Sequence, residues 1–141
     1  MVKVVCTFNL QEWKEEVVEV LSQTGKVSSV RACGPLEGDI AGQVNTLYLL
    51  YYVTEKQGNY TGYTRVSGHH DMREGTFIIE ETGVFDEEVV RSSVRVVPGS
   101  GTGDFKGILG TGSFASSHGS SVESRFELEF AERVETMGTK M

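Results

Sequence analysis

The chain has 141 residues and a formal net charge of −7, and it contains 17 glycines but only 2 prolines. This length is typical of one domain with its own hydrophobic core, so we treat residues 1–141 as a single domain. The acidic balance and the scattered lysines and arginines argue against binding to nucleic acid, which needs clustered positive charge. Abundant glycine with scarce proline is typical of a β-sheet protein.

The first residues begin directly on a strand-like pattern, with no signal-peptide core and no apolar run long enough to span a bilayer. Cys6 and Cys33 are too few for a disulfide framework and lack the spacing of metal ligands, so both are predicted to be small buried side chains. We therefore expect a cytoplasmic protein with no membrane contact, no metal and no cofactor.

Alternating apolar and polar residues, rich in β-branched and aromatic side chains, predict about eight strands. Their expected positions, in chain order, are residues 2–10, 26–37, 40–54, 60–70, 76–85, 89–97, 105–114 and 121–133. Turn-forming sequences such as Gly38-Asp39 and Pro98-Gly99 separate them. Because the connections are short and closure removes exposed edges, the pattern favours an all-β, antiparallel β-barrel of about eight strands.

Residues 11–25 do not alternate in this way. Their apolar side chains recur at helical spacing, at Trp13, Val17, Val20 and Leu21. Gly25 stands where a glycine commonly ends a helix. This segment is predicted to be either a short helix or an irregular lead-in to the next strand.

The strand expected over residues 40–54 contains a run, residues 44–53, that is apolar on both faces. A barrel strand with one face in water should alternate, so the outer face of this run is expected to be covered. The cover would be residues 11–25 or another subunit, and the second option gives a homodimer through residues 44–53. The alternative is that its tyrosines tolerate exposure.

The glycine-rich run over residues 99–112 looks at first like a phosphate-binding loop. It lacks the Lys-Ser/Thr ending of such a loop, and the residues after it do not form an amphipathic helix pattern. Single apolar residues between closely spaced glycines instead favour short extended pieces that turn tightly within a sheet.

The order of motifs along the chain resembles one known family. The motifs are Trp13, Gly38-Asp39-Ile40-x-Gly42, Tyr48-Leu49-x-x-Tyr52, Gly62 with Arg65 and Gly68, Gly75-Thr76-Phe77, Gly83-x-Phe85-Asp86, residues 96–103, Gly107-x-x-Gly110-x-Gly112-x-Phe114, and His118. This is a family of uncharacterised, mostly bacterial single-domain proteins. Their fold is similar to that of the plant allene oxide cyclases, an eight-stranded antiparallel barrel of calycin-like type.

The resemblance covers nearly the whole chain and implies this barrel fold, but it implies no agreed activity. More distant relatives of the barrel include cyclases that hold a flexible substrate in an apolar lumen. The catalytic motif of the plant enzymes is not visible in this sequence, so none of their residues is assigned here.

Arg65, Glu80 and Glu81 are the first candidate catalytic residues. Residues 60–70 and 76–85 are predicted to form a hairpin around residues 71–75, which would place Arg65 opposite Glu80 or Glu81. Glu81 shares the face of Phe77 and Phe85 and is predicted to point inward. A carboxylate and a guanidinium in an apolar lumen would orient a substrate or carry acid–base chemistry. The alternative is a structural or rim ion pair.

His118 is the fourth catalytic candidate, because a histidine at a barrel mouth can serve as a general base near neutral pH. The alternative is a loop histidine that hydrogen-bonds to nearby backbone. His69-His70-Asp71 suggests a metal site only weakly, since adjacent residues of a strand point to opposite faces.

Four aromatic residues are candidates for ligand binding: Tyr48, Tyr52, Trp13 and Phe77. Tyr48 and Tyr52 share one strand face, and their hydroxyls could bind a ligand carbonyl. Ordinary core packing is the alternative for these residues, and Trp13 could equally plug one barrel end.

Three functions remain open from the sequence. The barrel could be a cyclase or isomerase that folds an apolar intermediate in its lumen, since such catalysis needs restriction of conformation more than a strong nucleophile. It could be a non-catalytic carrier of a small apolar molecule. It could also be a structural or interaction module packed solid, which a continuous cavity above about 300 Å³ would exclude.

Overall fold

The computed structural model describes residues 1–21, 25–117, 119 and 121–131. This part of the chain contains ten β-strands and no helix. The strands are β1 (Val2–Asn9), β2 (Glu12–Val20), β3 (Lys26–Gly38), β4 (Ala41–Tyr52), β5 (Gly58–His70), β6 (Arg73–Phe85), β7 (Val89–Val96), β8 (Thr102–Gly103), β9 (Leu109–Ser117) and β10 (Ser121–Glu129).

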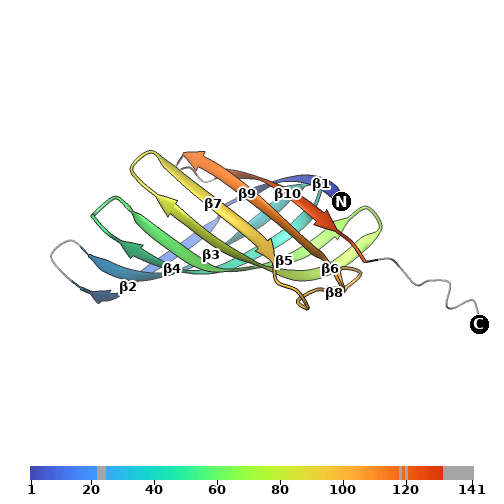
Figure 1. The fold of residues 1–141 in the computed structure, drawn as a ribbon, viewed down its shortest axis with the longest axis horizontal. Helices are drawn as coiled ribbons and strands as arrows, with labels where there is room; N and C mark the ends of the chain where they lie inside the picture. Colours follow the sequence, from blue (N-terminus) through green and yellow to red (C-terminus); the bar gives the residue numbers. More distant parts are fainter. Residues whose placement is uncertain (22–24, 118, 120, 132–141) are drawn as a thin grey trace, which may run out of the picture.

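Eight of these strands, within the described residues, close into an antiparallel barrel (Figure 1). Their order around the barrel is β1, β10, β9, β7, β6, β5, β4 and β3, and β1 then pairs with the end of β3. The short β8 pairs with β6 outside this ring. The predicted all-β barrel of about eight strands is therefore confirmed.

Strand alternation fills one half of the barrel. Inward side chains of this closed half, with Val4, Val96 and Leu128 among them, are nearly inaccessible to solvent. The glycine-rich run supplies the closure, because Phe105 and Ile108 turn into the barrel end and are 0% and 1% exposed. The strand expected over residues 105–114 thus begins only at Leu109, since residues 105–108 form this turn.

Residues 12–20 form a strand, so both the helix and the irregular lead-in predicted for residues 11–25 are wrong. β2 continues the path of β1 and pairs with the first half of β3, from Glu12 opposite Cys33 to Val20 opposite Lys26. It runs on beyond the barrel wall (Figure 1). Every residue of β2 is exposed, so burial imposes no alternation, and its valines follow no strand-like spacing.

The outer face of β4 is not covered by residues 11–21 or by any other described segment. Leu47, Leu49 and Tyr51 are 48%, 52% and 42% exposed. Because β2 lies beside β3 in the plane of the sheet, it cannot cover this face. The expected intramolecular cover is therefore wrong, and the homodimer stays a prediction.

Replacing Phe105 with alanine should destabilise the protein by about 3–5 kcal/mol, because the ring fills the closed end and packs edge-on against Phe77 at 5.3 Å between centroids. Urea unfolding followed by circular dichroism measures this loss. The exposed neighbour Lys106, changed to alanine, should alter stability by less than about 0.5 kcal/mol. Equal effects of the two changes would contradict the conclusion that Phe105 closes this end of the barrel.

Candidate functional site

The other half of the barrel is open and contains a cavity of about 620 Å³. Its walls are mainly apolar and include Trp13, Leu50, Tyr52, Phe85, Phe114 and Phe126. The turns between β4 and β5 and between β6 and β7 lie at this end of the barrel (Figure 1). The barrel is therefore not packed solid, so the solid packing expected under the third functional alternative is wrong.

Glu81 lies on the floor of this cavity, inside the barrel, and is only 4% exposed. Its Oε2 accepts hydrogen bonds from the Tyr48 hydroxyl at 2.8 Å and from Thr64 Oγ1 at 2.7 Å. The Tyr60 hydroxyl lies 3.4 Å from Oε1. The inward position predicted for Glu81 is therefore confirmed, while its chemical role stays a prediction.

A second set of contacts extends this network sideways. Thr64 also hydrogen-bonds to Thr46, and the Tyr60 hydroxyl lies 2.6 Å from Ser92 Oγ. Ser92 Oγ in turn donates to the carbonyl of Thr82 at 3.3 Å. The polar side chains thus form one layer between the packed half of the barrel and the cavity.

Burial raises the pKa of the Glu81 carboxyl, and the hydrogen bonds from Thr64, Tyr48 and Tyr60 oppose this rise only in part. Burial also raises the pKa values of Tyr48 and Tyr60, and the nearby Glu81 charge raises them further. Both phenols therefore stay protonated. A carboxyl group that favours its neutral form in an apolar cavity can donate a hydrogen bond or a proton.

Two inward glycines make room for the tyrosine rings. Gly62 lies opposite Tyr48, and a Cβ atom there would come within 2.6 Å of the Tyr48 ring. Gly83 lies opposite Tyr60, and a Cβ atom there would come within 2.5 Å of that ring. Because real Cβ contacts are longer, each glycine allows the neighbouring ring to lie flat along the wall and reach Glu81.

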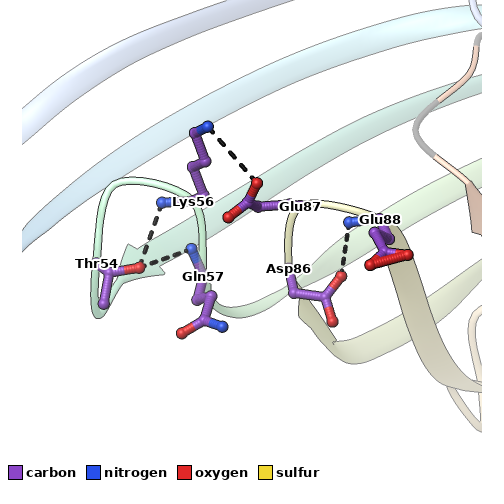
Figure 2. A network of polar contacts seen from close by, with 6 residues as sticks. All are labelled: Thr54, Lys56, Gln57, Asp86, Glu87 and Glu88. Atoms are coloured by element: carbon purple, nitrogen blue, oxygen red, sulfur yellow. Dashed lines mark hydrogen bonds and ion pairs between the residues drawn. The ribbon is translucent and has the colours of Figure 1, made fainter.

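Two turns form part of the cavity rim (Figure 2). Thr54 Oγ1 accepts hydrogen bonds from the backbone N–H groups of Lys56 and Gln57, and Asp86 Oδ1 accepts one from that of Glu88. Lys56 Nζ lies 3.6 Å from Glu87 Oε2 and links the turns. Both side chains of this ion pair are 64% exposed, so it adds little stability.

Arg65 does not face Glu80 or Glu81, so the predicted pairing is wrong. It lies opposite Ile78 on β6 and points to the outer face. The hairpin turns tightly at Asp71, which adopts φ 54°, and not over residues 71–75. This tighter turn changes the register by two or three residues. Glu80 instead pairs with Arg95, Nε to Oε1 at 2.8 Å, on the outside of the barrel.

The predicted aromatic residues separate into two groups. Tyr48, Tyr52 and Trp13 line the cavity, and Glu15 accepts hydrogen bonds from the last two, at 2.6 Å from Tyr52 and 3.2 Å from Trp13. Trp13 is 47% exposed at the mouth and does not plug the barrel. Phe77 is 2% exposed in the closed half and does not line the cavity, so its expected place in the ligand site is wrong.

His118 lies outside the described residues, so its predicted role cannot be placed. The other two histidines, His69 and His70, are the last two residues of β5, and His70 Nδ1 is 2.8 Å from the carbonyl of Asp39. Among the described residues, no three histidine, cysteine or acidic side chains gather as a metal site would require. The same residues include no helix long and apolar enough to cross a membrane.

Sequence reasoning missed four members of the polar layer: Thr46, Tyr60, Thr64 and Ser92. Each occupies an inward position of a strand and is less than 9% exposed. The signal for them was present, since a polar residue that replaces an apolar one in an alternating strand marks a polar site inside the barrel.

A family model described as "Protein of unknown function (DUF3224)" matches residues 4–129, so the chain belongs to this family. A crystal structure of a DUF3224 protein of unknown function from Shewanella oneidensis MR-1 superposes with a TM-score of 0.71. It is 20% identical and covers 94% of this chain and 99% of its own, which shows a shared fold. No curated protein matches the sequence. The expected uncharacterised family is confirmed, while the likeness to allene oxide cyclases stays a prediction.

Replacing Glu81 with glutamine should stabilise the protein increasingly as pH rises above about 4.5, the ordinary pKa of the carboxyl in the unfolded chain. Below that pH both states hold the proton. Above it the unfolded chain releases the proton while the folded state retains it, so the wild type alone loses folding free energy until its raised folded pKa is passed. Thermal unfolding from pH 4 to pH 8 measures the difference in stability between the two proteins. A difference that does not change with pH would contradict a raised pKa for Glu81.

Proposed function

We propose that this member of the DUF3224 family binds a small, mainly apolar molecule in the open half of its barrel. The observation that carries the proposal is the cavity of about 620 Å³, which has apolar walls and one polar layer at its floor. Ligand pockets of globular proteins commonly measure 300–1,000 Å³ and combine apolar walls with a few placed polar groups.

The distribution of charge inside the barrel supports an apolar ligand. Among the described residues that line the cavity, four have ionisable carboxyl or amino side chains. Glu81 lies at the floor, and Lys56, Asp86 and Glu87 lie in the rim turns. A ligand that reaches the floor therefore exchanges water for aromatic and aliphatic contacts along most of its length. Its binding free energy would come mainly from burial of apolar surface.

A second candidate function is catalysis by a cyclase or isomerase, and the Glu81 layer favours it. Glu81, Tyr48 and Tyr60 bring one carboxyl and two phenols together beside the cavity. Such groups can stabilise charge that develops on a bound intermediate, while the walls restrict its conformation. Conversion of a bound molecule, absent in a Glu81→Gln variant, would distinguish this function from simple carriage.

Binding of the neutral fluorescent probe N-phenyl-1-naphthylamine tests the proposal. Ser124 lines the cavity, so Ser124→Trp should fill part of it and raise the Kd of the probe about tenfold. That change corresponds to the loss of about 55 Å² of apolar contact at about 25 cal/mol/Å². Glu123→Trp places the same side chain on the adjacent, outward position of β10 and should leave the Kd unchanged.

Equal effects of the two tryptophans would place the probe outside the barrel and contradict the proposal. Native mass spectrometry of freshly purified protein provides an independent test, because a resident ligand adds its mass to the chain. The Ser124→Trp protein should carry less of that mass than the Glu123→Trp protein.

A further inference from the structure

The polar layer contains more hydrogen-bond contacts than its hydroxyl groups can supply with hydrogens. Six contacts of the described residues connect it: Thr46–Thr64, Thr64–Glu81, Tyr48–Glu81, Tyr60–Glu81, Tyr60–Ser92 and Ser92 to the carbonyl of Thr82. If each contact is a separate two-centre hydrogen bond, six hydrogens are needed, and the five hydroxyl groups supply five. If Glu81 is ionised, the single hydrogen of the Tyr60 hydroxyl must be shared between Glu81 Oε1 and Ser92 Oγ.

A proton on Glu81 removes this shortage. Tyr60 then donates to Ser92, and Ser92 donates to the carbonyl of Thr82. Thr64 and Tyr48 donate to Oε2 of Glu81, which leaves Oε1 to carry the proton. Across its 3.4 Å contact with Tyr60, a protonated Oε1 donates, whereas an ionised Oε1 accepts from the Tyr60 hydroxyl. Thr46 donates to Thr64, because the Thr64 hydrogen is used on Glu81. Each of the six contacts then has its own hydrogen, as expected for a buried polar network.

The Oε1 proton is the most replaceable link of this network. Its contact with Tyr60 is 3.4 Å long, whereas Glu81 Oε2 accepts at 2.7 and 2.8 Å. A long hydrogen bond is weak, so a ligand atom in the cavity can compete for this hydrogen without breaking the others. Tyr48 and Ser92 are already engaged in short contacts of 2.8 and 2.6 Å.

The groups around Glu81 disfavour binding of a charged ligand at the cavity floor. The titratable side chains that contact it are Tyr48 from β4 and Tyr60 from β5, and burial keeps both neutral. Among the described lining residues, Lys56 is the cation, and it pairs with Glu87 at the rim. A ligand carboxylate at the floor would find no positive partner, and a ligand amine would require a buried ion pair.

We infer that the cavity selects an electrically neutral molecule that accepts a hydrogen bond, as a ketone or ester carbonyl does, from the protonated carboxyl group of Glu81. This inference rests on the proposed binding function and specifies the ligand class of the same site. The apolar part of the ligand lies along the aromatic walls, and its acceptor atom points to the floor.

Four naphthalene derivatives of one shape test the class: 2-acetylnaphthalene, 2-ethylnaphthalene, 2-naphthoate and 2-(aminomethyl)naphthalene. Their affinities are measured at pH 5, near the ordinary carboxyl pKa of about 4.5, by displacement of N-phenyl-1-naphthylamine. The ketone should bind about tenfold more tightly than the hydrocarbon, because it gains one buried hydrogen bond. The anion and the ammonium ion should bind no more tightly than the hydrocarbon.

Two variants show whether Glu81 is the donor. Glu81→Leu removes the donor and should abolish the tenfold preference for the ketone. Glu81→Gln keeps a neutral N–H donor and should preserve it at every pH between 5 and 9. In the wild type the preference should decline with rising pH as the carboxyl ionises. A preference that came only from the shape of the ketone would not change with pH. The pH profile therefore tests the Glu81 proton even if the leucine variant does not fold.

The outcomes separate the two proposals. Tight binding of the hydrocarbon with no preference for the ketone would overturn the ligand class and leave the binding function standing. Preference for the ammonium ion would show an ionised Glu81 and overturn the class as well. Failure of all four compounds and of the displaced probe to bind would remove the binding function, and the ligand class with it.

Discussion

The cavity depends on a short seam that closes the barrel. β1 pairs with β10 over eight residues, from Val2 to Asn9, but it pairs with β3 only through Cys6, Thr7 and Phe8. Gly38 ends this seam with φ 117°, and a Cβ atom there would come within 2.5 Å of the Val5 carbonyl oxygen. A side chain at residue 38 would therefore push the two strands apart and open the wall.

Closure produces two halves with different physical demands. In one half Phe105 and Ile108 complete an apolar core, so burial stabilises the fold directly. In the other half the walls surround space, and the polar layer contains a carboxyl group whose burial is costly in its ionised form. A second, smaller buried cluster lies in the wall of this open half and consists of Val30, Ala32, Leu50 and Tyr60. The larger apolar core lies in the closed half.

Most of the barrel was predictable because its strands alternate locally. The inward position of Glu81 follows from its place between Phe77 and Phe85 on one strand face. The position of Arg65 did not follow, since the pairing register depends on whether the turn uses two residues or five, and the left-handed conformation of Asp71 selects the shorter one. β2 was missed for a different reason. Apolar and polar residues alternate along a strand because one of its faces is buried. Every residue of β2 is exposed, so its sequence shows no such alternation.

The polar layer could not be predicted from the pattern of any single strand. Thr46, Thr64 and Ser92 come from three strands, and each taken alone is an ordinary small residue. Only the register of β4, β5, β6 and β7 brings them to one level around Glu81. The glycines opposite Tyr48 and Tyr60 belong to the same arrangement, because their meaning depends on the ring across the ladder.

β2 carries Trp13 to the cavity mouth but leaves one side of its backbone without a partner strand among the described residues. Free strand edges invite other chains to add to a sheet. Four of the nine residues of β2 are glutamates, at positions 12, 15, 16 and 19, and Lys14 is the single basic one. If two copies paired along this edge of β2, their glutamate side chains would lie close together and repel each other. This repulsion protects the exposed edge of β2 against strand pairing that would grow into fibres.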